Sequence, residues 1–330
     1  MGGRLTILIL GGYGTFGGRL ATLLADETRL TLVIAGRSRA KAQAFCDALG
    51  AKAETVALAF DREGDVERQL REARPDIVVD ASGPFQDYDD PYRVIRACLA
   101  CGVNYLDLAD GSDFVKGVAQ FDAQAKACGL FVLSGVSSFP VLTAAVVRML
   151  AMGMSRVDTV EGGIAPSPYA GVGLNVIRAI ASYSGQPIEL RDGTHHGLAE
   201  SRYFTVAPPG RVPLGRIRFS LVDVPDLKVL PELWPSLKSI WIGAGPVPEI
   251  LHRALNGMAE IRFHQGDLEE SRRLLARSQL AYKTAANLNQ MGIDMVKKLK
   301  YEQALEHYTR AQYVLPQQDK GPLQIGRAHV

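Results

Sequence analysis

Residues 5–17 read LTILILGGYGTFG, and this stretch decides the fold class. Leu5–Leu10 is a short, continuous apolar run, which is typical of a strand buried on both faces of a sheet. Thr15–Asp26 has the amphipathic pattern of a helix, and a glycine-rich turn separates the two segments. A strand, a Gly-x-Gly-x-x-Gly turn and a helix in this order are typical of a dinucleotide-binding unit.

The same alternation continues through the first 150 residues. Further short apolar runs are Leu30–Ala35, Thr55–Ala59, Ile77–Val79, Tyr105–Leu108 and Leu130–Leu133. The amphipathic stretches between them are Ser38–Leu49, Val66–Ala73, Pro91–Cys101 and Phe114–Cys128. Apolar strands separated by helices predict a parallel sheet covered on both faces. Residues 1–150 are therefore expected to form a doubly wound α/β (Rossmann) domain.

The composition excludes several classes of protein. The chain has 330 residues, of which 47% are hydrophobic and 22% charged, with a net charge of +2. A disordered chain needs low hydrophobicity and a high net charge, and a nucleic-acid-binding domain is usually basic. The 4 cysteines are too few for a disulfide scaffold. No apolar run approaches the roughly 20 residues of a membrane span, so a cytoplasmic protein is expected.

The glycine loop is the first candidate site. Its residues are Gly12, Tyr13, Gly14, Thr15, Phe16 and Gly17. In this motif the first glycine permits the tight turn, the second lets the backbone approach a pyrophosphate, and the third lets the helix pack closely. The N-terminus of the following helix offers free N–H groups to the phosphates.

The end of the second strand predicts which cofactor binds. An NAD site usually has Asp or Glu there, to hold the ribose 2′-hydroxyl. This strand ends in Ala35-Gly36 and is followed by Arg37 and Ser38, without a carboxylate. A guanidinium can bind a 2′-phosphate through two parallel hydrogen bonds. The sequence therefore predicts NADP(H), with Arg37 as a solvated loop residue the alternative.

A family resemblance rests on two further motifs. The stretches are Val79–Phe85, which reads VDASGPF, and Gly102–Leu108, which reads GVNYLDL. Together with the glycine loop they resemble the saccharopine dehydrogenase (saccharopine reductase) superfamily over residues 4–255, and more closely an uncharacterised bacterial branch of it. The resemblance implies a Rossmann domain, a substrate domain and NADP(H). It also places Ser82, Gly83 and Pro84 beside the nicotinamide and its ribose, and Phe60 and Asp61 near the adenine.

The sequence departs from the family pattern at Gly135–Pro140. The family often has an acidic residue in this stretch, where the chain has Ser137. This departure argues against an amino-acid-type substrate. The second departure lies at the C-terminus, where helical sequence replaces the segments that complete the family's substrate domain.

Substrate-contacting residues are expected where strands end at the crevice of the sheet. The candidates are Gln86, Tyr88, Asp107 and Asp110. The alternative for the two aspartates is a solvated loop, with Ser112 or Asp113 capping the next helix. No residue is identified as catalytic.

Two other polar motifs are not predicted to carry chemistry. His195 and His196 are expected in a polar surface loop, with a role opposite the nicotinamide as the alternative. Cys98 and Cys101 have the spacing of half a metal site, but no second pair exists and buried free thiols are common. No metal is predicted.

The rest of the chain is expected to contain two further parts. Residues 151–255 have strand-like segments and irregular proline-rich connections, which predict a partial, smaller mixed α/β substrate domain. Its expected strands are Val157–Ile164, Arg202–Val206, Arg216–Val222 and Leu237–Ile242. Residues 256–324 are rich in helix formers and repeat with a period near 34 from about residue 255 to 316, which resembles the tetratricopeptide repeat. A plain helical hairpin is the alternative.

The last six residues, Ile325–Val330, are what ATC GGA AGA GCA CAC GTC encodes, a string that resembles a sequencing-library adapter. We expect residues 325–330 to be a non-native tail. The chain is then truncated, or a chimera joined near residue 255, and either form would lack activity.

Taken together, the sequence predicts an NADP(H)-dependent oxidoreductase that transfers hydride to or from a small organic substrate in an interdomain cleft. The alternatives are a non-catalytic NADP(H)-binding sensor or interaction module, and a truncated or chimeric chain. A homodimer, and a protein partner bound through the helical segment, are further possibilities that the sequence leaves open. Neither nucleic acid nor a membrane is expected as a partner.

Overall fold

The computed structural model describes residues 4–165, 186–198, 200–206 and 215–245. The predicted repeats, the expected join near residue 255 and the six-residue tail all lie outside these residues. The chain divides into two compact units. Among the described residues, the first unit consists of residues up to Val160 together with Asp223–Ile240, and the second of the remainder.

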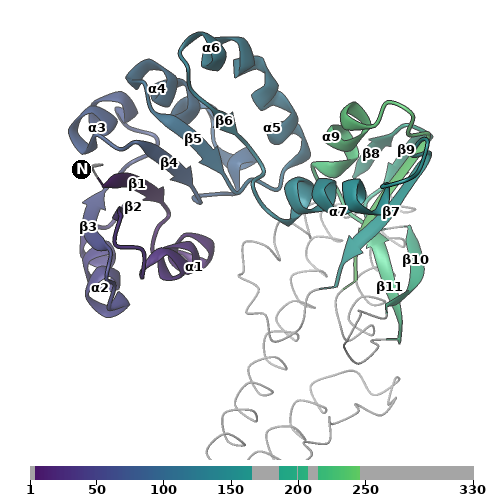
Figure 1. Ribbon diagram of the computed structural model, residues 1–330, viewed down its shortest axis with the longest axis horizontal. Coiled ribbons are helices and arrows are strands. Elements are labelled where there is room, and N and C mark those ends of the chain that lie inside the picture. The colour runs from purple at the N-terminus through teal and green to yellow at the C-terminus, as the bar shows by residue number, and fades with distance from the viewer. Residues whose placement is uncertain (1–3, 166–185, 199, 207–214, 246–330) are drawn as a thin grey trace, which may run out of the picture. The chain divides into compact units, whose positions relative to one another are not determined.

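A six-stranded parallel sheet forms the centre of the first unit (Figure 1). Its strands are β1 (Leu5–Leu10), β2 (Leu30–Gly36), β3 (Glu54–Ala59), β4 (Ile77–Asp80), β5 (Asn104–Asp107) and β6 (Val132–Leu133). The strand order is β3-β2-β1-β4-β5-β6, and every adjacent pair is parallel. This is the order of a dinucleotide-binding doubly wound sheet, which changes direction between β1 and β4. The predicted fold class is confirmed.

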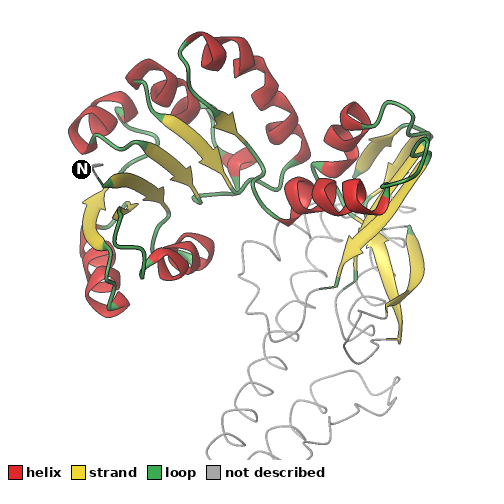
Figure 2. Cartoon of the chain, viewed as in Figure 1, coloured by secondary structure: helices red, strands yellow, loops and turns green. Residues whose placement is uncertain are grey.

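Helices alternate with these strands along the chain (Figure 2). They are α1 (Thr15–Leu24), α2 (Arg39–Leu49), α3 (Val66–Ala73), α4 (Arg93–Cys101), α5 (Ser112–Gly117), α6 (Asp122–Ala127) and α7 (Thr143–Leu150). Short helical turns are η1 (Phe85–Asp87), η2 (Val118–Phe121) and η3 (Ser138–Leu142). Side chains start two of the helices, because Ser38 accepts from the Lys41 N–H and Asp65 from the Arg68 N–H. Each cap satisfies a backbone donor that the first helical turn leaves free.

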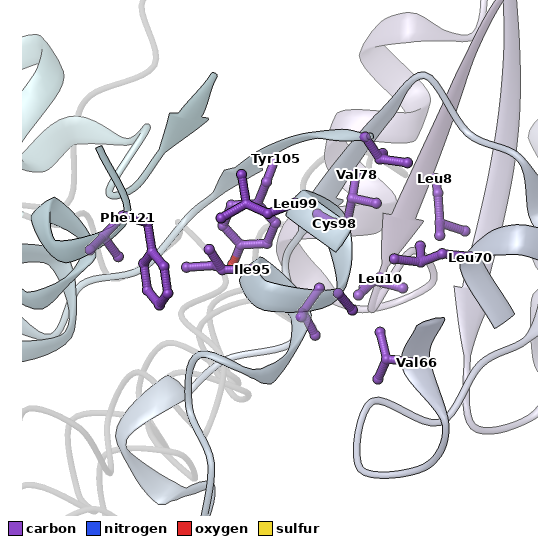
Figure 3. Packing of buried hydrophobic residues seen from close by; sticks show 14 of the residues in the cluster. Leu8, Leu10, Val66, Leu70, Val78, Ile95, Cys98, Leu99, Tyr105 and Phe121 are labelled. Carbon is purple, nitrogen blue, oxygen red and sulfur yellow. The ribbon is translucent and has the colours of Figure 1, made fainter. Parts of the chain in front are cut away.

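Two apolar clusters hold the sheet between its helices. One face of the sheet packs against α1 and α2, and its cluster includes Ile9, Ile34 and Ala42. The other face packs against α3, α4 and α5, and Figure 3 shows part of that cluster, including Leu8 and Leu70. Consecutive strand residues point to opposite faces, so a strand buried on both faces must be apolar throughout.

Two local predictions were wrong in this unit. Phe114–Cys128 was expected to be one helical stretch, but it forms α5, η2 and α6, with Gly117 at the first break. Glycine has a low helix propensity. A Cβ on Gly117 would overlap the Tyr92 hydroxyl, so a larger residue does not fit there. The N-cap of α5 is Gly111, not Ser112 or Asp113, and no side chain caps it.

A later segment of the chain completes the first unit. Helix α9 (Asp226–Leu233) packs against α5, where Lys228 pairs with Asp113. The buried Ser112 hydroxyl donates to the Asp223 carboxylate over 2.8 Å.

The second unit contains antiparallel strands. A four-stranded sheet has the order β10-β11-β12-β7, and β8 and β9 form a separate hairpin. The strands are β7 (Thr159–Ile164), β8 (Pro187–Leu190), β9 (Gly193–His196), β10 (Ser201–Val206), β11 (Gly215–Leu221) and β12 (Ser239–Ala244). On the larger sheet, the Phe204 ring packs against Phe219 and Trp241, with centroid distances of 5.6 and 5.8 Å. Strands β7 to β12 and helix α9 all lie within residues 151–255, so the predicted mixed α/β character of this stretch is confirmed.

Candidate cofactor site

The glycine loop connects β1 to α1 and leaves the N-terminus of α1 without a side-chain cap. The Gly14 N–H donates to the Gly11 carbonyl over 2.8 Å, which closes the turn. A Cβ on Gly17 would lie 2.3 Å from the Gly11 carbonyl oxygen, so only glycine permits this approach of helix to loop. Thr15 and Phe16 are exposed at the start of the helix. The arrangement provides uncapped N–H groups beside a loop with little side-chain bulk, which suits a pyrophosphate.

The Tyr13 side chain extends from this loop to the end of β2. A Cβ on Gly36 would lie 2.7 Å from the Tyr13 ring, so the ring rests directly on the strand. The Tyr13 hydroxyl accepts a hydrogen bond from the Ser38 N–H over 3.1 Å. The glycine loop and the start of α2 are thus held together by one side chain.

Arg37 lies between these two contacts. Its side chain is exposed, and it forms no ion pair with any residue in the described ranges. Among the residues that immediately follow β2, none is acidic. Within the described ranges, the end of β2 therefore carries an unpaired guanidinium on Arg37, which lies in sequence between the two residues that contact Tyr13.

The end of β3 places Phe60 and Asp61 in different surroundings. Phe60 is buried, whereas Asp61 is exposed. The Asp61 carboxylate accepts from the Glu63 N–H over 3.0 Å, and the Asp61 N–H donates to Gln69 over 2.8 Å. These bonds fix the loop that carries Arg62.

The end of β4 carries a buried ion pair. Arg62 and Asp80 have exposed side-chain fractions of 8% and 0%, and the Arg62 Nη2 lies 3.0 Å from the Asp80 Oδ2. The other Asp80 oxygen, Oδ1, accepts from both the N–H and the hydroxyl of Ser82. The Tyr88 hydroxyl donates to the Ser82 carbonyl over 2.7 Å. The loop containing Ser82, Gly83 and Pro84 is thus tied to Asp80 and to Tyr88.

The end of β5 carries a second buried carboxylate, Asp107, which pairs in register with Asp80. Its Oδ1 accepts from the N–H groups of Ala109 and Gly135 and from the Ser134 hydroxyl, over 2.8–2.9 Å. Burial raises the pKa of Asp107 to about 6, against the lowering effect of these donors. Asp107 therefore joins the loops that follow β5 and β6.

Asp110 differs from Asp107, although the sequence suggested a common role. The residue as a whole is exposed in the loop after β5, but its carboxyl group is partly shielded from solvent, and this desolvation raises its pKa. Gln86 lies in the turn η1, between Phe85 and Asp87.

A polar cavity of about 270 Å³ lies beside the β3 and β4 loops. Its lining residues are Arg62, Glu63, Tyr88, Asp89, Asp90 and Arg93. Both carboxylates and guanidiniums line it, and Arg93 and Arg96 both pair with Asp90.

Arg62 and Asp80 were not among the site residues predicted from the sequence. Asp80 had one usable signal, because it is a charged residue at the end of an otherwise apolar strand of sequence IVVD. Arg62 had none, since its partner lies 18 positions away and the two meet only after β3 and β4 have formed.

The prediction for His195 and His196 was wrong. Both lie in strand β9, where His195 pairs in register with Ile188 of β8. The alternating pairing of the hairpin was missed because the stretch is polar. The His195 ring nitrogens contact Glu200 at 2.7 Å and Asp192 at 3.1 Å.

In the described part of the chain, no group of three or more His, Cys, Asp or Glu side chains is arranged to hold a metal ion. Nor does a described helix have the length and apolar character needed to span a membrane.

Solved structures with similar folds were found. GenD2 from gentamicin A biosynthesis, in complex with NAD, is 17% identical, and the match covers 74% of this chain and 66% of that one, with a TM-score of 0.35. Biliverdin reductase from Synechocystis sp. PCC 6803, in complex with biliverdin and NADP+, is 15% identical over 74% of this chain and 73% of that one, with a TM-score of 0.35. The WlbA (WbpB) dehydrogenase from Thermus thermophilus, in complex with NAD and alpha-ketoglutarate, is 15% identical over 82% and 93%, with a TM-score of 0.36. The chain thus spans just under two thirds of the length of GenD2.

The comparison with curated proteins found no match. The family comparison covers part of the predicted resemblance, which extended over residues 4–255. Residues 7–133 match the family model of the saccharopine dehydrogenase NADP binding domain, which supports a nicotinamide dinucleotide site in this part of the chain.

Proposed function

We propose that this chain is an NADP(H)-dependent oxidoreductase resembling saccharopine dehydrogenase, which transfers a hydride between NADP(H) and a small organic substrate. The observation that carries the cofactor proposal is the end of β2, where Arg37 is exposed and no acidic residue follows the strand. A carboxylate at this position would accept from a ribose 2′-hydroxyl and repel a 2′-phosphate. A guanidinium instead donates two parallel hydrogen bonds to a phosphate.

The residues around the glycine loop fit a dinucleotide. Gly17 lies so close to Gly11 that any side chain at position 17 would overlap the Gly11 carbonyl oxygen. The N-terminus of α1 provides uncapped N–H groups for the pyrophosphate. Arg37 and Ser38 would bind the 2′-phosphate, and the Tyr13 hydroxyl, which already accepts from the Ser38 N–H, would donate its own proton there. Phe60 and Asp61 would lie near the adenine, and Ser82, Gly83 and Pro84 beside the nicotinamide.

When bound, the nicotinamide supplies or accepts the hydride, and the protein orients it and excludes water. On the substrate side, Asp107 is buried and holds the loops after β5 and β6 together. Asp110 is exposed in the first of these loops, which makes it the better candidate for substrate contact. Gln86 and Tyr88 follow β4 at the same edge of the sheet. A cytoplasmic location, a homodimer and a protein partner of residues 256–324 stay predictions from the sequence.

Titration of the purified chain with NADPH and with NADH, followed by the emission of the nicotinamide, tests the proposal. We expect NADPH to bind more tightly, and Arg37→Ala to remove the difference with a loss of about 1.5–3 kcal/mol for the charge-assisted pair. Arg39→Ala, which removes an exposed guanidinium two positions away, should leave the preference unchanged. The cofactor assignment would be wrong if the wild-type chain bound neither nucleotide, or if it preferred NADH.

A further inference from the structure

We propose that Arg62 and Asp80 are positioning residues that hold the Ser82–Pro84 loop in the conformation needed by the nicotinamide half of the cofactor. The proposal rests on the proposed function, and it adds a role for two buried residues that act through the contacts of Ser82. The observations behind it are the contacts that link Ser82 to Asp80 and Tyr88, and both of these residues to Arg62.

Asp80 is the centre of these contacts. It is fully buried at the end of β4, and its two oxygens serve different partners. Oδ2 pairs with Arg62, and Oδ1 accepts from the Ser82 N–H over 3.0 Å and from the Ser82 hydroxyl. The backbone N–H and the side-chain hydroxyl of Ser82 therefore both donate to the same carboxylate oxygen.

Tyr88 binds the remaining backbone group of Ser82, its carbonyl. Its hydroxyl donates to the Ser82 carbonyl over 2.7 Å, and the Arg62 guanidinium lies 3.8 Å from the centroid of its ring. Arg62 also lies 5.4 Å from the Phe85 ring centroid. The guanidinium thus contacts Asp80 and Tyr88, and each of these two residues holds a different backbone group of Ser82.

The position of Ser82 relative to the glycine loop connects these contacts to the cofactor. Strands β1 and β4 are neighbours, and the sheet changes direction between them. A Cβ on Gly11 would lie 2.8 Å from the Ala81 carbonyl oxygen and 3.2 Å from the Ser82 Cα. Dinucleotides bind across such a switch point, with one half on each side. The β2 side carries the expected 2′-phosphate residues, so Ser82 lies on the side of the nicotinamide half.

The energetics favour a positioning role over a purely stabilising one. A buried ion pair gains little net stability, because desolvation of two charges offsets most of their attraction. Apolar side chains of similar size would fill the same space without this cost. What apolar residues cannot provide is a carboxylate that accepts two hydrogen bonds from Ser82.

The test compares a whole dinucleotide with its adenosine half. NADPH and 2′,5′-ADP are titrated against the wild-type chain, Asp80→Asn and Tyr88→Phe. Asp76→Asn is the matched control, because it makes the same chemical change as Asp80→Asn. Asp76 is exposed and directly precedes β4, at the opposite end of the strand from Asp80. Circular dichroism and thermal unfolding establish that each variant is folded.

We expect Tyr88→Phe to weaken NADPH about fivefold, the effect of one lost neutral hydrogen bond, and Asp80→Asn to weaken it about tenfold or more. Binding of 2′,5′-ADP should remain within about twofold of the wild type for both variants, because the lost contacts are confined to the β4 loop. The nicotinamide emission maximum should shift with the variants but not with Asp76→Asn. If Asp80→Asn does not fold, the affinities of Tyr88→Phe for the two ligands test the inference by themselves.

Two results would overturn the inference while leaving the proposed function intact. In one, both ligands lose affinity equally; in the other, neither loses any. A wild-type chain that binds neither NADPH nor 2′,5′-ADP would instead contradict the proposed function, and the inference with it.

Discussion

The end of β2 and the ends of β4 and β5 use polar residues in opposite ways. After β2, Arg37 is exposed and has no acidic partner in the described ranges. At β4 and β5, Asp80 and Asp107 are fully buried and bound to neighbouring loops. The first region presents an exposed charge, whereas the carboxylates of the second fix the backbone of the loops that follow β4, β5 and β6.

This difference has a physical origin in burial. An exposed charge remains hydrated, so it needs no partner within the protein and lowers the stability of the unliganded fold very little. A buried carboxylate must be neutralised or hydrogen-bonded by the protein itself. Substitutions at β2 should therefore change ligand preference with little effect on stability, whereas substitutions at β4 and β5 should also change the stability of the fold.

The largest expected effect is that of Arg62→Met, which leaves Asp80 buried without its cation. Removing one partner of a buried pair costs about 3–5 kcal/mol, because the remaining charge is uncompensated. The double variant Arg62→Met with Asp80→Asn should recover most of this loss, since no buried charge remains. Denaturant unfolding measures both. A loss below about 1 kcal/mol in the single variant would show that Asp80 does not need Arg62.

The next effect concerns the pH dependence of stability at Asp107. Burial raises the pKa of Asp107 to about 6 from 3.8, so the folded chain binds a proton that the unfolded chain has released at the same pH. Stability is therefore lower above pH 6 and rises as the pH falls toward 4, by about 3 kcal/mol for a shift of this size. Asp226 has a raised pKa of about 6 for the same reason and contributes in the same direction.

Asp107→Asn should raise the free energy of unfolding at pH 8 and flatten its change between pH 8 and pH 4. The amide oxygen keeps an acceptor for Ala109, Ser134 and Gly135, while the buried charge is removed. Unfolding measured at the two pH values tests this. A variant less stable than the wild type at pH 8 would mean that the three donors outweigh desolvation.

A smaller effect is expected for Tyr13→Phe at the end of β2. The hydroxyl holds the Ser38 N–H and has a proton left for a 2′-phosphate. Its loss should weaken NADPH by about 1 kcal/mol, and NADH by less. Tyr92→Phe removes a comparable hydroxyl, which donates to the Phe114 carbonyl, away from this loop. Equal losses for NADPH and NADH in Tyr13→Phe would assign the hydroxyl a structural role only.

The smallest effect is expected for a surface pair, which sharpens the contrast with Arg62 and Asp80. Arg4 and Glu54 lie 2.8 Å apart but are 57% and 50% exposed. Arg4→Ala should change the free energy of unfolding by less than about 0.5 kcal/mol, because solvent screens the pair. Denaturant unfolding, repeated at high salt, is the measurement. A loss similar to that of Arg62→Met would show that burial does not separate the two pairs.

The sequence predicted the parts of the fold that depend on local patterns. The apolar run Leu5–Leu10 and the helix Val66–Ala73 have the predicted boundaries. Gly117, inside a predicted helical stretch, marked a break that the amphipathic pattern did not reveal. His195 was placed in a loop because a polar hairpin lacks the apolar alternation by which strands are recognised.

The candidate site divides in the same way. The sequence by itself determined the parallel doubly wound sheet, the glycine turn and the missing carboxylate after β2, because each is written in consecutive residues. Only the tertiary structure decided that Arg62 meets Asp80, that Asp107 is buried and that Tyr13 rests on Gly36. These contacts join residues from separate βα units. Their geometry follows from the order and spacing of the strands, which no local stretch of sequence specifies.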